Sequence, residues 1–375
     1  MIYLDYSANT PVDEAVLERF CAVERSCPGN ANSRHQAGAA AKAAIDEATQ
    51  SIARSLHVQP AEIIYTSGAS EANNFALKSI ARLERHHGKH IISTPLEHSS
   101  VSGTLTALQE QGYEIDLVDI KQDGTVDLAH LRELLRPDTI LVAVTAVDSE
   151  LGVVQPVAEI AALLKDYPHC HLHVDATQAV GKLPLPSFEG IDTLSLTAHK
   201  FYGLNGIGVL VKRRGLALEP LIHGGESTTI YRSGTPTVAL AASLETALNS
   251  AVNELSERSA RVKEANLYLR TALSKYPKVR INSPESAIPH ILNLSVENVK
   301  GTVFQRELDA EGVCVSVKSA CSSDGLPSRA VFAVSRDRKN ALSSWRISLS
   351  HLTTQEELDG FLRAFDACYT RLTQL

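Results

Sequence analysis

The chain has 375 residues, of which 44% are hydrophobic and 21% charged, so it is long enough for two domains and has the composition of an ordinary globular enzyme. Its formal net charge of -7, without a basic run, argues against direct binding of nucleic acid. No apolar run approaches the roughly 20 residues that cross a bilayer, and the first residues lack a signal-peptide pattern, so we expect neither a membrane span nor secretion.

The six cysteines are scattered along the chain without a Cys-x-x-Cys pair. In a chain of this size, that distribution favours free thiols in a reducing cytoplasm over a disulfide framework. We also predict no metal site, because the cysteines and histidines suggest no cluster at metal-ligand spacing.

The N-terminal part is expected to form an extended arm followed by two helices. The arm covers residues 1–11 and ends in a turn signal, Asn9-Thr-Pro11. Helical patterns follow at about 12–25 and 37–56. Between them, residues 27–35 are rich in turn formers and form either a solvated loop or part of a site.

From about residue 61, short apolar strands alternate with helices, which indicates βαβ units and a mostly parallel sheet covered on both faces. Ligands collect at the carboxyl ends of the strands in such sheets, and here those ends are followed by polar turns. The strands are expected at 63–66, 91–94, 115–118, 139–145, 172–174, 193–196 and 208–211.

Three of these turns carry candidate site residues. Small residues from Ser67 to Ser70 open a helix, whose N–H groups suit a phosphate, although a serine there can equally serve as an ordinary helix cap. Asp175 ends an apolar strand, where a carboxylate needs a partner to stay charged. His98 follows another strand, but a lone histidine in such a place is more often structural than catalytic.

The stretch from Thr193 to Gly208 places Lys200 after a strand, in a loop rich in histidine, aromatic and glycine residues. A lysine amine delivered in this way can form a Schiff base with a carbonyl cofactor. Taken alone, the segment fits a surface lysine in a glycine turn as well.

The C-terminal part favours a smaller α+β domain. A helical run from about Val238 to Tyr276 connects to it, a strand is expected at 290–296, and the last helix begins at Thr353-Thr-Gln-Glu-Glu357, which can form a capping box. We assign residues 12–260 to a large domain, and residues 1–11 and 261–375 to a small one.

Three further residues have polar surroundings. Cys321 follows a strand and stands among small residues, as a thiol that must reach a substrate would, although an incidental loop cysteine fits equally. Arg346 lies in a strand and suits a substrate carboxylate or a structural ion pair. Thr235, in Arg232-Ser-Gly-Thr235, belongs to an anion site or to a glycine turn.

Taken together, the motifs resemble the cysteine desulfurases, pyridoxal-phosphate (PLP) enzymes of the class V aminotransferase group, over essentially the whole chain. The motifs are Gly29-Asn-Ala-Asn-Ser-Arg-His35, Thr66-Ser-Gly-Ala-Ser-Glu-Ala-Asn-Asn74, His173-Val-Asp-Ala-Thr-Gln178, Ala198-His-Lys-Phe-Tyr-Gly203, Arg232-Ser-Gly-Thr235 and Ser319-Ala-Cys-Ser-Ser323. The resemblance implies the α/β fold of aspartate aminotransferase, with a mostly parallel seven-stranded sheet, and a homodimer with its active sites at the subunit interface.

The resemblance also implies roles. Lys200 would carry the Schiff base, Asp175 would pair with the pyridine nitrogen, and the Cys321 thiolate would take sulfur from L-cysteine and hold it as a persulfide for an acceptor protein, a scaffold or a tRNA-thiolation enzyme. His98 would stack on the ring and help to move protons, and Arg346 would bind the substrate carboxylate. The remaining cofactor contacts would come from Ala69, Ser70, Ser149, Gln178, Thr197, His199 and, from the other subunit, Thr235.

Three places depart from the family pattern. Ser149 replaces an asparagine near the cofactor ring, and Lys318 replaces a glycine before Ser-Ala-Cys. The segment Gly224-Gly-Glu-Ser lacks the usual Gln/His-Glu pair after its glycines. The alternatives are therefore another class V enzyme, such as a selenocysteine lyase or an aminotransferase, or a weakly active scaffold in sulfur transfer.

Overall fold

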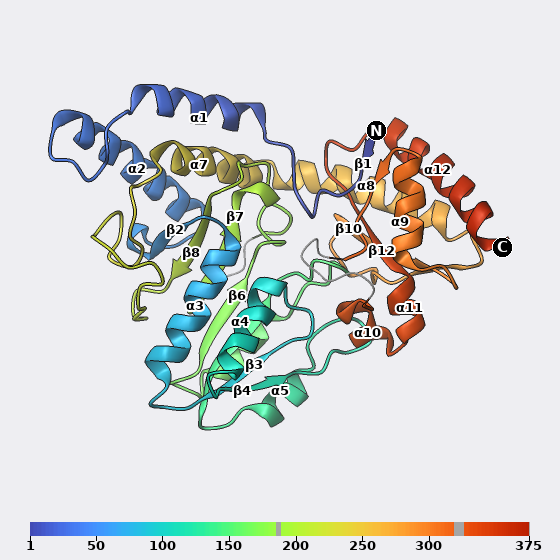
Figure 1. Cartoon of the computed structure of the whole chain (residues 1–375), viewed down its shortest axis with the longest axis horizontal. Helices are drawn as coiled ribbons and strands as arrows, with labels where there is room; N and C mark the ends of the chain where they lie inside the picture. The colour runs from blue at the N-terminus through green and yellow to red at the C-terminus, as the bar shows by residue number, and fades with distance from the viewer. Residues whose placement is uncertain (185–188, 319–325, 375) are drawn as a thin grey trace.

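The computed structural model describes residues 1–184, 189–318 and 326–374, and its centre is a seven-stranded sheet (Figure 1). The strand order is β2-β8-β7-β6-β5-β3-β4, and only β8 runs antiparallel to its neighbours. This confirms the predicted mostly parallel sheet. The strands are β2 Ile63–Thr66, β3 His90–Ser93, β4 Glu114–Leu117, β5 Thr139–Thr145, β6 His171–Asp175, β7 Thr193–Thr197 and β8 Gly208–Lys212.

Both faces of the sheet are covered by helices, which explains why its central strands read as continuous apolar runs. One face packs against α3 (Ala69–Glu84) and α4 (Ser99–Gln109), and side chains such as Phe75 and Leu141 share that core. The other face packs against α6 (Val157–Leu164) and α7 (Val238–Asn253), with Leu172 and Leu244 in a second core. A short helix, α5 (Leu128–Leu134), lies on this same side, because Leu131 is buried in the second core.

The N-terminal helices form an outer layer on α7. Helices α1 (Glu14–Ser26) and α2 (Gln36–Ser55) both pack against α7, around a small core that contains Val23 and Ile45. Figure 1 shows this layer along the top of the large sheet. The two predicted helices are confirmed within two residues at each end.

The C-terminal part contains a separate hydrophobic core. Three antiparallel strands, β9 (Val279–Ile281), β10 (Ile291–Val296) and β12 (Ser344–Ser348), pack with α8 (Leu255–Leu273), α9 (Gly301–Ala310) and α12 (Gln355–Thr373). The arm returns to this part, because β1 (Ile2–Tyr3) pairs with β11 (Val313–Cys314) and Leu4 is buried in the same core. Our division into residues 12–260 and the rest stays a proposal.

One sequence expectation needs correction. The helical run of residues 238–276 is two helices, α7 and α8, with a break at Glu254; α7 packs on the large sheet and α8 on the C-terminal core, so one straight helix would not serve both. Two short helices, α10 (Arg329–Ser335) and α11 (Arg338–Ser343), come before β12, and the sequence did not predict them. Among the described residues, no helix is long and apolar enough to span a membrane.

Candidate active site

A cavity of about 340 Å³ lies where the carboxyl ends of β5, β6 and β7 meet the start of α3. The position agrees with the rule that ligands bind at the carboxyl ends of strands in such sheets. Ten of the predicted site residues line this cavity: Ala69, Ser70, His98, Ser149, Asp175, Gln178, Thr197, His199, Lys200 and Arg346.

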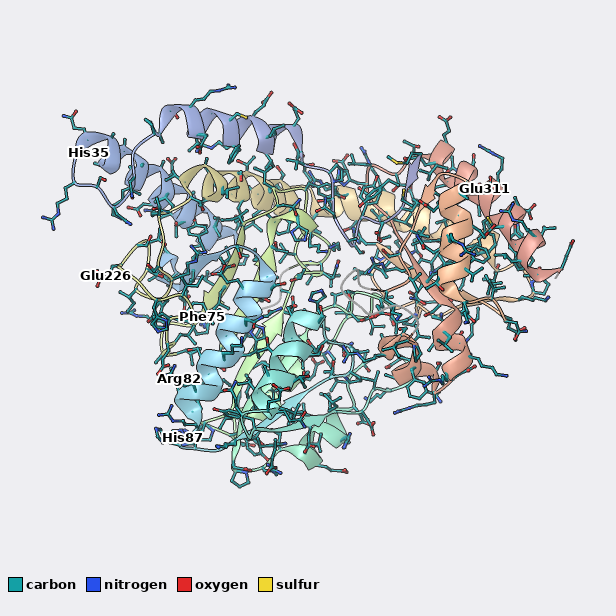
Figure 2. All side chains as sticks on the ribbon, in the orientation of Figure 1. His35, Phe75, Arg82, His87, Glu226 and Glu311 are labelled. Carbon is teal, nitrogen blue, oxygen red and sulfur yellow. The ribbon has the colours of Figure 1, made fainter. Side chains whose placement is uncertain are left out.

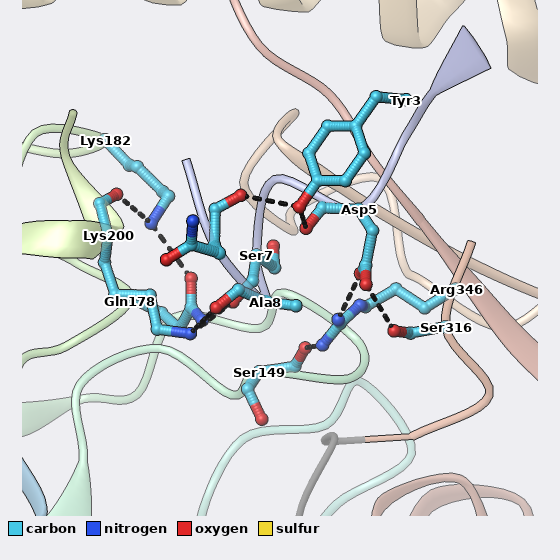
Figure 3. A network of polar contacts seen from close by, with 11 residues as sticks. Tyr3, Asp5, Ser7, Ala8, Ser149, Gln178, Lys182, Lys200, Ser316 and Arg346 are labelled. Atoms are coloured by element: carbon cyan, nitrogen blue, oxygen red, sulfur yellow. Dashed lines mark hydrogen bonds and ion pairs between the residues drawn. The ribbon is translucent and has the colours of Figure 1, made fainter. Parts of the chain in front are cut away.

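Lys200 ends a short 3-10 turn, Ala198–Lys200, which directly follows β7. Its Nζ donates to the backbone oxygens of Ser7 and Ala8 at 2.7 and 2.6 Å. Both oxygens belong to the N-terminal arm, which therefore forms one wall of the site (Figure 3). In both contacts the partner is a backbone carbonyl oxygen, so the N-terminal arm orients the lysine amine through hydrogen bonds.

Asp175 is buried at the end of β6, with 3% of its surface exposed. Its Oδ2 accepts a hydrogen bond from Asn73 Nδ2 at 2.8 Å, and its Oδ1 accepts one from the backbone N–H of Thr177 at 3.0 Å. In the described part of the chain, no cationic side chain pairs with this carboxylate. A buried carboxylate held in this way is suited to a cationic ligand atom.

Asn73 is fixed by a buried network. Its Oδ1 lies 3.0 Å from His173 Nε2 and accepts a short hydrogen bond from the hydroxyl of Ser195. His173 in turn bonds to Thr193 Oγ1 at 2.9 Å. Burial lowers the pKa of His173 to about 4, although the charge of Asp175 acts in the opposite direction. His173 is therefore neutral, and Asp175 carries the charge of the network.

Gln178 lies three residues after Asp175, in the turn that follows β6. Its Nε2 donates to Ser7 O at 2.9 Å, and its Oε1 accepts from Lys182 Nζ at 2.9 Å. The carboxamide has a second N–H on Nε2, which can donate to a ligand in the cavity. Lys182, which the sequence did not single out, fixes which way this amide points.

The end of β2 and the start of α3 form a cradle suited to a phosphate. Gly68 has φ of 152°, a conformation that favours glycine, and it leads directly into the first turn of α3. A side chain at Gly208 would collide with Gly68, since its Cβ would lie 2.7 Å from Gly68 Cα. The first N–H groups of a helix attract anions, so this helix start next to Thr197 and His199 suits a phosphate.

Both histidines of the cavity favour the neutral form. Burial, together with the charges of Lys200 and Lys182, lowers the pKa of His199 to about 4. Burial also lowers the pKa of His98, although Asp175 opposes the shift. His98 Nδ1 accepts from the backbone N–H of Ser100 at 3.2 Å, which leaves the proton on Nε2 in the neutral ring.

Arg346 on β12 is almost fully buried and connects the two halves of the site. Its Nη2 forms an ion pair with Asp5 Oδ1 at 2.9 Å, and its Nη1 donates to Ser149 O at 2.7 Å. Ser316 also donates to Asp5, at 2.7 Å, so the carboxylate is held from two sides (Figure 3). The guanidinium group has five N–H donors, and Nε has no partner among the described residues, so donors remain for a substrate carboxylate.

Two predicted site residues remain, Thr235 and Cys321. Thr235 is not among the residues that line the cavity in the single chain, and its predicted role in the other subunit stays a prediction. Arg232, three residues earlier, forms an ion pair with Glu71 at 3.0 Å, which brings the segment next to the first turn of α3. Cys321 lies outside the described residues.

Sequence reasoning gave no role to Asp5, Asn73 or Lys182. Asn73 lies inside the quoted motif Thr66–Asn74, and Lys182 lies four residues after Gln178. Their short distance along the chain from predicted site residues could have identified both as candidates. The crossing of the N-terminal arm over the site was not visible in the sequence, because the arm and Lys200 lie far apart in the chain.

The cavity fits PLP on the features described here. A buried carboxylate that pairs with no cationic side chain of the described residues suits the pyridine nitrogen, a helix start suits the phosphate, and Lys200 follows a strand end beside the same cavity. Gln178 has an N–H to offer a ring oxygen.

Comparison with known proteins agrees with this chemistry. The family model described as "Aminotransferase class-V" matches residues 2–361. The cysteine desulfurase IscS of Proteus mirabilis (strain HI4320) is 40% identical over 382 residues, covering 100% of this chain and 94% of that protein. A solved "NifS-like protein" is 34% identical with a TM-score of 0.92 and full coverage of both chains. The structure titled "SspA in complex with cysteine" is 30% identical with a TM-score of 0.83, covering 94% of this chain and 100% of that one.

Proposed function

The chain belongs to the class-V aminotransferase family, and we propose that it is a PLP-dependent cysteine desulfurase that converts L-cysteine to L-alanine. The observation that carries the proposal is the meeting of Lys200, Asp175 and Arg346 around one cavity. These residues offer an amine, a buried carboxylate and a guanidinium group, which match a carbonyl cofactor and an amino-acid substrate.

We propose that Asp175, Gln178 and the start of α3 hold PLP, with Lys200 as its covalent attachment point. When bound, PLP supplies an electron sink for the substrate carbon next to the amino group. Asp175 keeps the pyridine nitrogen protonated, because a buried carboxylate stabilises a neighbouring positive charge. Ala69 and Ser70 offer N–H groups to the phosphate, and Thr197 and the neutral His199 lie beside them.

Arg346 would bind the carboxylate of L-cysteine with the N–H groups that Asp5 and Ser149 leave open. Lys200 would move protons between substrate carbon atoms, because its amine is positioned at the cavity by two carbonyl oxygens. His98 would serve as a second donor through its Nε2 proton. Its lowered pKa keeps the ring neutral, so the ring can lie over an aromatic cofactor without a charge.

We assign the sulfur-transfer step to Cys321. Its thiolate attacks the substrate sulfur, a sulfur–sulfur bond forms, and the bond between substrate carbon and sulfur breaks. The electron pair of the broken bond stays with the carbon, which takes up a proton and leaves as alanine. The sulfur remains as a persulfide on Cys321 and passes to an acceptor protein of the scaffold or tRNA-thiolation class.

Two further parts of the proposal concern the protein's setting. We propose a reducing compartment such as the cytoplasm, which is supported by the free thiols of Cys21, Cys27, Cys170, Cys314 and Cys368. We also propose a homodimer in which Thr235 reaches the phosphate of the other subunit. This part of the proposal follows from the resemblance to the family; within one chain, the ion pair of Arg232 with Glu71 keeps the segment beside the first turn of α3.

The test is to measure alanine and sulfide released from L-cysteine by the wild type and by Cys321→Ala. We expect both products to fall at least about 100-fold in the variant, because the nucleophile is lost. Its PLP content and visible spectrum should not change, which separates a lost nucleophile from a lost cofactor. Sulfide release that survives the substitution would contradict the persulfide route and leave another class V activity.

A further inference from the structure

A second group of potential metal ligands lies at the amino ends of the strands of the large sheet, whereas the cavity lies at their carboxyl ends. Glu84 ends α3, His87 follows in the next turn, and His169 lies in the turn before β6. One ligand atom from each of the three lies within 4.8 Å of the other two. Figure 2 shows His87 at the end of α3 that is remote from its first turn.

His87 already contacts both of the other side chains. Glu84 Oε2 lies 2.7 Å from His87 Nδ1. The rings of His87 and His169 stack with their centroids 3.6 Å apart and only 9° between their planes. Both histidines are exposed and stand in turns, so their rings can rotate without disturbing the core. Two imidazoles and one carboxylate thus occupy one small surface region.

A second layer of contacts orients the carboxylate. Glu84 Oε1 lies 3.4 Å from His171 Nε2, and His171 Nδ1 lies 3.3 Å from Asp192 Oδ1. Asp192 is itself fixed, because its Oδ2 accepts a hydrogen bond from the backbone N–H of Leu172 at 2.8 Å. Outer groups that hold the ligands in place in this way are typical of metal sites.

We propose that Glu84, His87 and His169 bind a zinc ion. Two imidazole nitrogens and one carboxylate oxygen are a known zinc ligand set, in which water takes the fourth position. The two stacked rings must turn out of parallel, because the lone pair of each nitrogen lies in its ring plane and both must converge on one ion. Rotation of the exposed side chains achieves this.

This proposal goes against our sequence prediction of no metal site. That prediction overlooked the alternating histidines of His169-Cys-His171-Leu-His173, and it had no means to pair them with Glu84 and His87. The pairing depends on α3 ending beside the start of β6, which only the fold shows.

The position of the site indicates what the ion does. The four steps along β6 from His171 to Asp175 correspond to about 13 Å at roughly 3.3 Å per residue, so the ion is separated from the cavity. It would connect the far ends of α3 and β6, the two elements whose other ends carry the phosphate cradle and Asp175. Its role is therefore to stabilise this part of the fold, without contact with the substrate.

The experiment uses the PLP-loaded protein after removal of metal with a chelator. Because the thiolate proposed as the nucleophile could also bind zinc, Cys321→Ser serves as the common background. Zn²⁺ is titrated by calorimetry into this background protein and into three variants made in the same background, namely His87→Ala, His169→Ala and Glu84→Gln. His86→Ala is the matched control, since His86 is an exposed neighbour of His87 that is not among the three proposed ligands. Co²⁺ then replaces Zn²⁺ as a coloured probe of the ligand set.

We expect one Zn²⁺ per chain in the background and in His86→Ala. Loss of either histidine ligand should weaken binding at least about 100-fold, and Glu84→Gln by at least about 10-fold. Zn²⁺ should raise the melting temperature only where binding is retained, because a ligand of the native state alone stabilises it. Absence of a saturable site in the background, or equal binding by His87→Ala and His86→Ala, would overturn the proposal. Circular dichroism verifies that each variant is folded.

Discussion

Lys182 Nζ lies 2.9 Å from Gln178 Oε1, and this lysine is almost completely buried beside the candidate active site. Burial, together with the positive charges of Lys200 and Arg346, lowers the pKa of Lys182 to about 7. The same Nζ lies 3.4 Å from the backbone oxygen of Lys200. A neutral amine has two N–H groups, which match these two acceptors. Lys182 therefore positions Gln178 and the Lys200 backbone together.

Lys182→Met should change the pH dependence of stability. Between pH 7 and about 10.5 the unfolded chain holds a proton on Lys182 that the folded chain has released, so stability from this group rises with pH across that window. Its cost to stability is greatest below pH 7. The advantage of the variant over the wild type should therefore be largest near pH 6.5 and should decrease by up to about 1.4 kcal/mol per pH unit above it.

Urea unfolding of both proteins at pH 6.5 to about 9.5 measures this difference directly. Lys275→Met is the matched control, because Lys275 is exposed. The control should show no change with pH relative to the wild type. A stability difference between Lys182→Met and wild type that stays constant with pH would contradict a lowered pKa for Lys182.

The strands of the large sheet could be predicted from the sequence, and the connections across the site could not. Runs such as Thr139–Thr145 are continuously apolar and are followed by polar turns, so their local pattern was sufficient. The two carbonyl oxygens on Lys200 come from Ser7 and Ala8, and the partner of Arg346 is Asp5. These contacts depend on how the arm returns from β1, which no local pattern specifies.

Asn73→Ala should weaken PLP binding and stability together. The substitution removes a hydrogen bond to the buried Asp175 carboxylate and leaves Ser195 and His173 without their shared acceptor. Leaving such groups unsatisfied costs about 1–3 kcal/mol, which corresponds to about a tenfold to hundredfold loss of PLP affinity if Asp175 is the group affected. Titration of the metal-free, PLP-free protein with PLP measures this loss of PLP affinity.

Asn74→Ala is the control for this experiment. Asn74 is the next residue on α3, it is partly exposed, and its side chain donates to Ser70 O at 3.0 Å instead of reaching Asp175. We expect its PLP affinity to remain within about threefold of the wild type, since an exposed hydrogen bond contributes little. Equal losses in the two variants would show that Asn73 does not act through Asp175.

Thr354→Ala should destabilise the last helix. Thr354 caps α12 by accepting from the backbone N–H of Glu357 at 3.2 Å, and the Glu357 carboxylate accepts from the backbone N–H of Thr354 at 2.9 Å. The sequence predicted this capping box. Loss of a helix cap costs about 1 kcal/mol, so the midpoint of urea unfolding should fall, whereas Thr353→Ala should lower it less. Equal effects of the two substitutions would contradict the cap.

Arg346→Lys should lower kcat/KM for L-cysteine by about 100-fold or more while PLP stays bound. The guanidinium group reaches Asp5 and Ser149 at once and has donors left for a carboxylate, whereas a single ammonium group offers no planar fork. Steady-state alanine formation and the PLP spectrum measure the two effects separately, and Arg363→Lys, at an exposed site, is the control. Asp5→Asn removes the competing negative charge but retains an acceptor, so its kcat/KM should fall less. A normal kcat/KM in Arg346→Lys would limit Arg346 to its ion pair with Asp5 and place the substrate carboxylate elsewhere in the cavity.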